Sequence, residues 1–355
     1  MAIHAIDLFC GIGGLTKGLS LAGINVVAGF DIDESCRFAY EKNNQAVFVC
    51  KNVENLLGKE LENYYNCHEN TIRVLVGCAP CQPFSRYSLR YRKNGQKDDK
   101  WRLLYSFQNL ITEVIPEIVS MENVPSLIKE KVFEDFKNNL LDLGYKVSVT
   151  IAYCPDYGVP QNRKRLVLLA SKFGNIAMLP PFFKKNNYNT VRKAIYDLPR
   201  IKAGQVCQED PLHRSSSLST INLKRVQQSV PGGSWRDWDR ELQLTCHGKK
   251  TGKTYPSVYG RMEWDKPSPT ITTQFYGYGN GRFGHPEQDR AISLREGAIL
   301  QSFPNDYVFS DEKHPAKTRE LGTHIGNAVP VELGRAIGLS IINHLKEYDV
   351  YGETD

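Results

Sequence analysis

Two cysteines three positions apart, Cys78 and Cys81, lie in a segment whose residue types could do chemistry. A zinc site would need a second ligand pair, and the sequence has no other C-x-x-C and no H-x-x-x-H. A redox dithiol usually opens a helix, whereas residues 82–85 are typical of an extended turn. The third interpretation is a single nucleophilic thiolate held between Pro80 and Pro83. The residue types alone leave these three chemistries open.

A glycine-rich turn, D-L-F-C-G-I-G-G from Asp7 to Gly14, follows the first predicted strand. Such glycines permit positive φ and a close approach of the backbone to a ligand, although a tight turn alone needs them too. The spacing departs from the dinucleotide fingerprint G-x-G-x-x-G because Thr16 occupies the third glycine position. Asp31, at the end of the next predicted strand, is placed to bind a ribose diol. The pattern therefore favours an adenosine-containing cofactor and counts against NAD.

The composition is typical of a globular protein. Apolar residues make up 41% and aromatic residues 10% of the 355 residues, which supplies a core and argues against disorder. Nine scattered cysteines indicate reduced thiols rather than a disulfide framework. No apolar run approaches the roughly 20 residues that a membrane helix needs, and the N-terminus lacks the features of a secretory signal. We therefore expect a cytoplasmic protein with no membrane partner.

The elements that must position these residues alternate between strand and helix. We expect strands at 3–9, 25–30, 71–76, 118–121, 147–153 and 166–170, and helices ending at 21 and spanning 35–42 and 103–115. This alternation predicts an α/β fold with a doubly wound, mainly parallel sheet that binds ligands at the carboxyl ends of its strands.

A second domain is expected where Gly, Pro, Ser, Thr and aromatic residues become frequent. It is predicted to be smaller and rich in loops or β-structure, with helices only at 191–198 and 294–301. Helical spacing returns at 328–345. The predicted divisions are 1–184, 185–321 and 322–355.

The cysteine segment resembles the Pro-Cys-Gln motif of the C5-cytosine DNA methyltransferases. Five other segments resemble further motifs in the family's order, namely 7–14 (with Cys10 where alanine is more usual), 122–124, 161–165, 295–304 and 326–330. The resemblance covers nearly the whole chain. It implies the Rossmann-like fold of S-adenosylmethionine-dependent methyltransferases, a target-recognition domain within 185–321, and DNA (cytosine-5) methyltransferase activity.

The resemblance also implies roles for individual residues. The family adds a thiolate to C6 of cytosine, which makes Cys81 the nucleophile and leaves Cys78 as a packing residue. Glu122 would be the acid near N3, and Arg163 would contact O2 of the base and orient Glu122. Arg165 would pair with a nearby carboxylate or backbone group, and Asn123 would tie down the turn that carries the nucleophile. The group that removes the C5 proton is not identified.

The implied cofactor is S-adenosylmethionine, with S-adenosylhomocysteine as product and no metal. The residues implied to bind it lie in the glycine turn, after the next strands and in the last motif: Phe9, Gly11, Gly13, Gly14, Asp31, Ile32, Asn52, Pro80 and Asn327. Asn52 departs from the family, which commonly has an aspartate there to accept from the adenine amino group.

A cytosine inside a duplex must be flipped out to reach such a pocket. The basic run after the nucleophile is compatible with a solvated loop, but its position favours closure over DNA by Ser85, Arg86, Arg90 and Arg92. Candidate base-reading residues in the second domain are Arg261, Gln274 and Arg282. The net charge of +6 hides a polarity, because segments 86–102, 161–184 and 185–321 carry +5, +5 and +6 and the rest carries −10.

Two alternatives share the catalytic residues or the fold. A tRNA cytosine-5 methyltransferase tends to carry Cys-Phe-Thr between the Glu-Asn-Val and Gln-x-Arg motifs, and this sequence has none there. An inactive DNA-binding regulator would not need Cys81, Glu122 and Arg163. We expect a monomeric prokaryotic enzyme that binds double-stranded DNA at the nucleoid and, by analogy alone, is paired with a restriction endonuclease.

Overall fold

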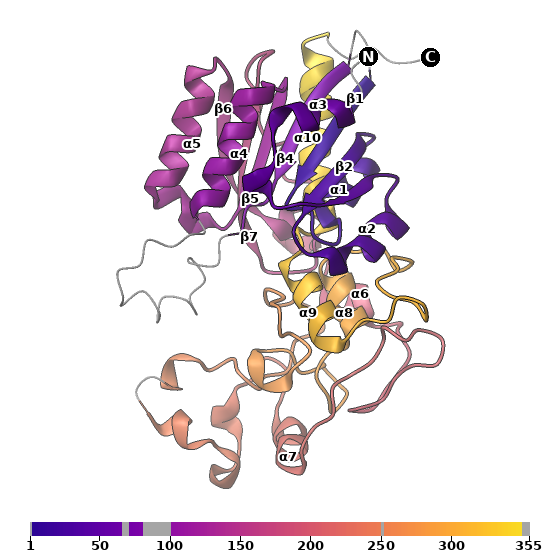
Figure 1. Cartoon of the computed structure of the whole chain (residues 1–355). Helices are drawn as coiled ribbons and strands as arrows, with labels where there is room; N and C mark the ends of the chain where they lie inside the picture. Colours follow the sequence, from indigo (N-terminus) through magenta and orange to yellow (C-terminus); the bar gives the residue numbers. More distant parts are fainter. Residues whose placement is uncertain (1, 66–70, 81–100, 250–251, 350–355) are drawn as a thin grey trace. The chain divides into compact units, whose positions relative to one another are not determined.

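The computed structural model describes residues 2–65, 71–80, 101–249 and 252–349 (Figure 1). The chain divides into two compact units. Residues 1–153, 164–182 and 329–355 form the first, and residues 154–163 and 183–328 form the second. These bounds differ from the predicted ones because the short segment 154–163 belongs to the second unit and the first unit resumes at Val329.

A seven-stranded mixed sheet forms the centre of the first unit, in the order β3-β2-β1-β4-β5-β7-β6. The strands are β1 (Ala2–Leu8), β2 (Asn25–Asp31), β3 (Val47–Cys50), β4 (Thr71–Gly77), β5 (Ile118–Asn123), β6 (Lys146–Tyr153) and β7 (Lys164–Ser171). The neighbours from β3 to β5 pair in parallel, whereas β7 runs antiparallel to β5 and β6. The predicted mainly parallel sheet is therefore confirmed, with one reversed strand. From β1 the chain adds β2 and β3 on one side of the sheet and then β4 and β5 on the other. Open α/β sheets bind ligands at the carboxyl ends of the two strands where the order reverses in this way, here β1 and β4.

Helices cover both faces of this sheet. They are α1 (Gly14–Leu21), α2 (Arg37–Asn43), α3 (Gly58–Tyr65), α4 (Trp101–Val114), α5 (Lys131–Asp142) and α10 (Val331–Glu347). Figure 1 shows α4 and α5 side by side over the strands. Alternate strand residues such as Leu8, Phe30 and Met121 pack with Phe107 and Phe136 of these helices in one buried core.

The other face of the sheet depends on a close approach of α1 and α10. A Cβ placed on Gly18 of α1 would lie 2.4 Å from the carbonyl oxygen of Val331 and 2.5 Å from the amide nitrogen of Arg335. Real Cβ atoms do not tolerate such contacts with backbone, so only glycine permits this packing. The C-terminal helix is thereby an integral part of the unit that carries the glycine turn.

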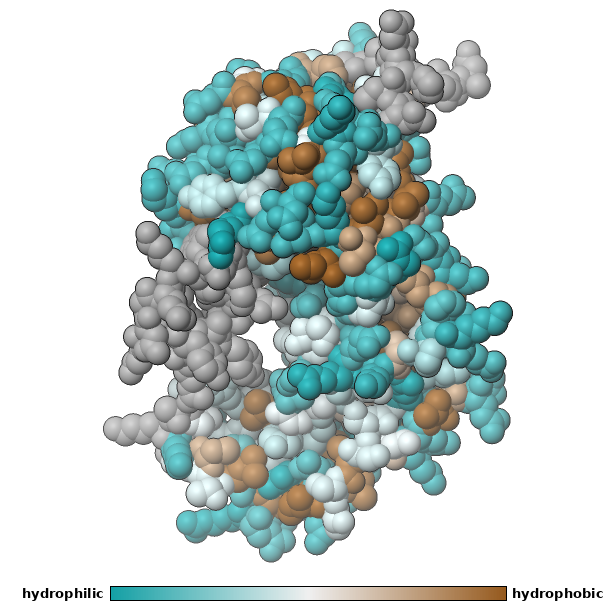
Figure 2. Space-filling view, in the orientation of Figure 1, coloured by the Kyte–Doolittle hydropathy of each residue, from teal (hydrophilic) through white to brown (hydrophobic). Residues whose placement is uncertain are grey.

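The surface of the first unit is mostly polar. On the face shown in Figure 2, apolar residues are scattered among hydrophilic ones.

Within the described residues, one helical stretch, Thr318–Glu347, is apolar and long enough to span a membrane by length and composition. Its most apolar window is 67% buried, which is typical of core helices, so it is weak support for a membrane span.

The second unit consists of short helices joined by long irregular segments. The helices are α6 (Val191–Ile195), α7 (Thr220–Gln228), α8 (Leu294–Leu300) and α9 (Thr318–Asn327). Residues 154–163, 183–249 and 252–328 contain isolated β-bridges and no longer strand. The predicted loop-rich character is confirmed. The β-rich alternative is wrong for this described part, because its frequent glycines and prolines break the chain into turns.

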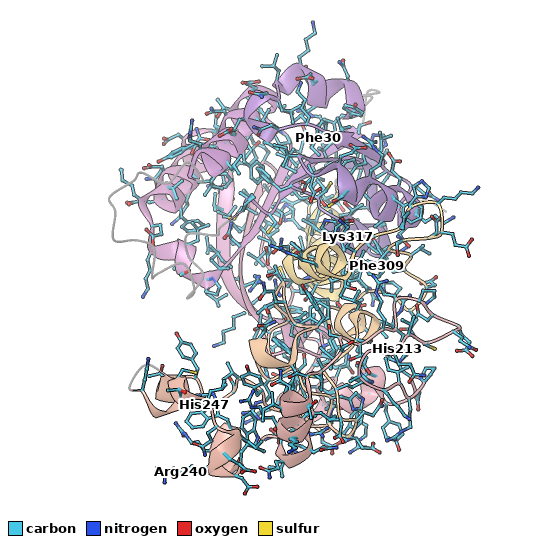
Figure 3. The ribbon with its side chains drawn as sticks, turned by 60° about the horizontal axis from the view of Figure 1, so that its bottom comes forward. Phe30, His213, Arg240, His247, Phe309 and Lys317 are labelled. Carbon is cyan, nitrogen blue, oxygen red and sulfur yellow. The ribbon has the colours of Figure 1, made fainter. Side chains whose placement is uncertain are left out.

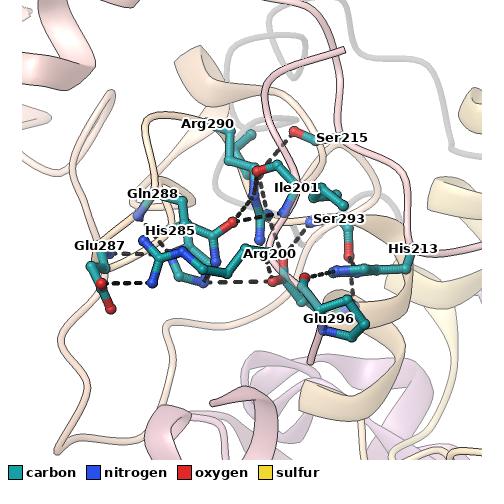
Figure 4. A network of polar contacts seen from close by, with 12 residues as sticks. Arg200, Ile201, His213, Ser215, His285, Glu287, Gln288, Arg290, Ser293 and Glu296 are labelled. Carbon is teal, nitrogen blue, oxygen red and sulfur yellow. Dashed lines mark hydrogen bonds and ion pairs between the residues drawn. The ribbon is translucent and has the colours of Figure 1, made fainter. Parts of the chain in front are cut away.

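Two buried clusters hold the second unit together. Around α8, Arg290 makes a two-pronged ion pair with Glu296, both contacts being 2.7 Å (Figure 4). Elsewhere in the unit the ring of His247, labelled in Figure 3, stacks on Trp235 with 4.1 Å between centroids, and Trp238 and Tyr259 pack around it. The unit thus uses buried polar and aromatic contacts where it lacks a sheet.

Candidate active site

The glycine turn has the strained, tightly folded backbone expected of a ligand-binding loop. Gly11 and Gly13 have φ of 50° and 83°. Phe9, a residue with a Cβ, also has a positive φ of 61°, which costs roughly 1–2 kcal/mol. Gly13 precedes the first turn of α1 without a capping side chain, and the N–H groups of that first turn suit this helix end to a negatively polarised group.

Asp31 connects the end of β2 to this turn. Its Oδ2 accepts from the Gly11 N–H at 2.8 Å, and its Oδ1 accepts from the Asp33 N–H at 3.0 Å. Burial raises the pKa of Asp31, and the two backbone donors partly offset that shift. The next residue, Ile32, is 68% exposed although it is strongly apolar. A carboxylate beside an exposed aliphatic side chain fits a ribose next to a flat apolar ring.

Asn52 follows β3 and Pro80 follows β4, two strands of the same sheet that are separated by β2 and β1. The Oδ1 of Asn52 accepts from the Glu54 N–H at 3.0 Å and caps a short 3₁₀ turn. An amide oxygen has a second lone pair, so this cap leaves Asn52 able to accept from a ligand as well. Pro80 is exposed just after β4.

Asp7, in the same motif, has an environment to which the sequence assigned no role. Its side chain is 1% exposed, its Oδ2 accepts from the Thr16 hydroxyl at 2.7 Å, and that hydroxyl lies 3.1 Å from the Tyr40 hydroxyl. Among the described residues, its Oδ1 has no hydrogen-bond partner. Burial raises the pKa of Asp7 to about 7, against the opposing bond from Thr16.

Glu122 is the next-to-last residue of β5, and its side chain is buried, with 2% exposed. The Nε of Arg165 lies 2.7 Å from its Oε1 and forms an ion pair with it. This pairing follows from strand register, since Glu122 is opposite Val167 on β7 and Arg165 is two residues away on the same strand face. The partner expected of Arg165, a nearby carboxylate, is thus Glu122 itself.

Cys78, just after β4, and Asn123, the last residue of β5, complete the surroundings of Glu122. The thiol of Cys78 donates to the Glu122 Oε2 at 2.7 Å. The adjacent Asn123 donates through Nδ2 to the carbonyl of Ala79 at 3.0 Å, and its Oδ1 accepts from the Val124 N–H. This hydrogen bond to Ala79 supports the expected tie between Asn123 and the segment before the nucleophile. The expectation that Cys78 only fills space is wrong, because its thiol contacts a carboxylate.

Several predicted site residues lie outside the described residues. They are the nucleophile Cys81 and the loop residues Ser85, Arg86, Arg90 and Arg92.

The Gln-x-Arg-x-Arg segment spans the junction of the two units. Gln161 and Arg163 belong to the second unit, and Arg165 belongs to the first. Arg163 donates to the Oε1 of Gln161 and to the carbonyl of Ile271, while Gln161 donates to the carbonyl of Leu300. Within the first unit Arg165 is paired with Glu122, and the expected contact of Arg163 with Glu122 stays a prediction. Asn327 is exposed at the last residue of α9 in the second unit.

The candidate DNA-reading residues have contrasting environments in the second unit. Arg261 is buried, and its guanidinium donates to the carbonyls of Val226, Ser229, His285 and Gln288 and to Asp289. All its donors are used, so its predicted contact with a base is wrong. Arg282 is half-buried and donates to the carbonyl of Gly233, whereas Gln274 is exposed.

Comparison with known proteins bears on this arrangement. The profile of the C-5 cytosine-specific DNA methylase family matches residues 3–343. The chain belongs to this family. Its activity is therefore that of a DNA (cytosine-5) methyltransferase, and its sheet is that of the S-adenosylmethionine-dependent methyltransferase fold.

The methylase resembles curated relatives along nearly its full length. It is 52% identical over 344 residues to the type II methylase M.HgiDII of Herpetosiphon aurantiacus, covering 96% of this chain and 95% of the relative. It is 32% identical over 357 residues to the type II methyltransferase M1.BsuMI of Bacillus subtilis, covering 95% and 80%.

Solved structures share its fold at low sequence identity. A structure from Escherichia coli described as a prophage-encoded DNA modification methyltransferase has a TM-score of 0.74 at 21% identity, covering 97% of this chain and all of that one. A methyltransferase of Entamoeba histolytica has a TM-score of 0.61 at 20% identity, covering 97% and 99%.

Proposed function

We propose that this methylase binds S-adenosylmethionine at the carboxyl edge of β1 and β2 and methylates C5 of a cytosine flipped out of duplex DNA. The observation that carries the proposal is the buried carboxyl of Glu122 near the end of β5, which is paired with Arg165 and accepts from Cys78, three residues before Cys81. When bound, the cofactor supplies an electrophilic methyl group.

The residues of the first unit fit such a cofactor. The positive φ angles of Gly11 and Gly13 bring backbone to the ligand side of the turn, beside the start of α1. Asp31 offers acceptor atoms to ribose hydroxyls, and Ile32 offers an apolar surface to adenine. Phe9, Gly14, Asn52 and Pro80 complete this part, and Asn327 is proposed as a further cofactor-binding residue.

The reaction needs a nucleophile and an acid on the same base. The Cys81 thiolate attacks C6, which places negative charge on the ring toward N3. Glu122 supplies a proton to N3 and so offsets that charge. Arg165 keeps the Glu122 carboxyl oriented, and Asn123 fixes the backbone before the nucleophile. Arg163 contacts O2 of the base through its planar guanidinium.

The DNA is held by basic residues of the run after Cys81 and by polar residues of the second unit. Ser85, Arg86, Arg90 and Arg92 contact phosphates next to the flipped base, which makes affinity fall with salt. Gln274 is the first candidate to read a base edge, because it is exposed, and Arg282 is the second. By analogy with the relatives' type II systems, the monomeric enzyme protects its host's DNA from a paired restriction endonuclease.

Trapping with 5-fluorocytosine tests this proposal. Fluorine at C5 cannot leave as a proton does, so the covalent adduct between Cys81 and C6 persists. Duplex DNA containing the analogue, incubated with enzyme and S-adenosylmethionine, should give a DNA-linked peptide that includes Cys81. The Cys81→Ala variant should give none, while Cys50→Ala serves as a control at an exposed cysteine. An adduct only with tRNA, or one unaffected by Cys81→Ala, would overturn the proposal.

A further inference from the structure

Three neighbouring strands of the first unit each bring one side chain to the same point. Gly77 on β4 pairs with Met121 on β5, so the next residue, Cys78, stands beside Glu122. On the other side β7 contributes Arg165. The Cys78 backbone is fixed as well, since its N–H donates to the carbonyl of Leu8 at 3.3 Å. The thiol is therefore held against the carboxylate by the sheet rather than by a loop.

The two oxygens of Glu122 have contacts of different kinds: Oε1 forms an ion pair with Arg165 that lacks hydrogen-bond geometry, whereas Oε2 accepts a hydrogen bond. Oε1 faces the guanidinium of Arg165, a permanent cation with a rigid donor fork. Oε2 accepts from the Cys78 thiol, and a thiol is a weak donor. A base that presents its N3 to the carboxyl can displace a thiol at much smaller cost than it can displace arginine. N3 of the cytosine can thus replace the Cys78 thiol as the hydrogen-bond partner of Glu122 on its Oε2 side.

We propose that Cys78 is a positioning residue, whose thiol holds the Oε2 edge of Glu122 in place until the cytosine ring replaces it. Arg165 keeps Oε1 throughout, so the carboxyl pivots on a fixed point. The inference rests on the proposed role of Glu122 and adds a residue to it. Without the thiol, the carboxyl of the free enzyme samples other orientations and is aligned less often when the base enters.

The decisive experiment compares Cys78→Ala with Cys78→Ser in the full-length enzyme. Loss of the donor should slow methyl transfer about 3- to 10-fold. It should also move the pH–rate profile toward higher pH, because a carboxylate that loses a donor is protonated more easily. Cys78→Ser keeps a donor of similar reach and should restore both the rate and the position of the profile. A profile that stays in place in Cys78→Ala, or a serine variant that behaves like the alanine variant, would overturn the inference.

A second measurement does not depend on activity or on the folding of a Cys78 variant. The negative carboxylate beside the thiol disfavours its thiolate, so iodoacetamide should alkylate Cys78 faster in Glu122→Gln than in wild type. Peptide mass spectrometry gives the rate, with exposed Cys50 as internal reference. Equal rates at Cys78 in the two proteins would contradict the contact.

The proposed function and the proposed role of Cys78 are contradicted by different results. If wild-type enzyme gives no Cys81 adduct with DNA, the proposed function fails and this inference falls with it. A positioned acid typically contributes about 10²–10⁴-fold to the rate, so methyl transfer by Glu122→Gln should be slowed at least 100-fold. If the adduct forms and Glu122→Gln is slowed in this way, a Cys78→Ala variant with the wild-type rate and pH–rate profile overturns only the inference about Cys78.

Discussion

Asp7 carries a carboxyl group that the fold removes almost completely from water. It lies in the glycine motif, yet its contacts are with Thr16 rather than with the exposed edge of the sheet. Its pKa of about 7, raised mainly by burial from an ordinary value of 3.8, means that ionising it in the folded protein is costly. The residue therefore links the stability of the cofactor-binding unit to pH.

The sign of this linkage is fixed by the raised pKa. Between pH 3.8 and about 7 the folded state holds a proton that the unfolded chain has released, so Asp7 lowers stability as pH rises through that window. Asp7→Asn should remove this penalty. The difference in unfolding free energy between the variant and wild type should therefore grow by at least about 1 kcal/mol from pH 4 to pH 8. The full pKa shift sets an upper limit of about 4 kcal/mol on this growth. Urea unfolding without cofactor measures it, with exposed Asp142→Asn as the control, and a gain equal at both pH values would contradict the assignment.

At the scale of elements, a buried ion pair stabilises the core around α8 in the second unit. Ser293 and Glu296 form a reciprocal cap at the start of α8, and the same Glu296 carboxylate binds Arg290 in the interior. Burial works against this charge, but Arg290 outweighs it and lowers the pKa of Glu296 to about 2. The helix start, its cap and the core thus depend on one carboxylate.

Removing that carboxylate should unfold the second unit easily. Glu296→Gln leaves Arg290 buried without its counter-charge, which costs about 3–5 kcal/mol. In wild type this contribution should be present above pH 4.5 and lost as pH falls toward 2, because the pKa is lowered. Tryptophan fluorescence during urea unfolding reports the second unit, which contains Trp235, Trp238 and Trp264.

The same substitution at an exposed pair is the matched control. Glu287, paired with Arg200 on the surface, should change stability little when replaced by glutamine. Equal effects of Glu287→Gln and Glu296→Gln would show that burial of the Arg290 pair contributes nothing.

The sequence predicted elements where the local pattern was strong. The apolar runs at 3–9, 25–30 and 71–76 became β1, β2 and β4. The four-residue strand β3 is too short to stand out, and the antiparallel direction of β7 is invisible because a strand buried on both faces has the same apolar run in either direction. The pairing of Glu296 with Arg290 was not predicted, because it required the fold.

The site divides in the same way. Motifs located Glu122, Asp31 and the glycine turn by residue type. They could not tell that Arg165 pairs with Glu122, since the register between β5 and β7 decides that contact. They likewise gave Cys78 no partner and gave Arg261 a surface role, because neither strand adjacency nor burial is visible at single positions.

At the scale of the whole molecule, charge is distributed unevenly along the chain. Segments 86–102, 161–184 and 185–321 are each net positive and the rest of the chain is net negative, although the total charge is only +6. The basic run that follows Cys81 contains Arg86, Arg90 and Arg92. Such a distribution should make DNA affinity depend on particular cations rather than on total charge.

Replacing these three arginines by alanine should change the salt dependence of DNA binding. The slope of log K against log salt should become shallower by about 0.9 for each lost phosphate contact. Binding of duplex DNA at several salt concentrations, with S-adenosylhomocysteine present, measures the slope. Lys137→Ala, an exposed cation on α5, should leave it unchanged, and an unchanged slope in the triple variant would mean that the run does not contact the backbone.

The central claim is that the chain transfers a methyl group to C5 of cytosine in duplex DNA through Cys81. Bisulfite sequencing of a plasmid from a methylation-deficient host that expresses the enzyme tests it most directly. The account predicts 5-methylcytosine within one short recurring sequence, and none when Cys81→Ser is expressed at the same level. An unmodified plasmid with wild-type enzyme, or a modification pattern that persists in Cys81→Ser, would contradict it.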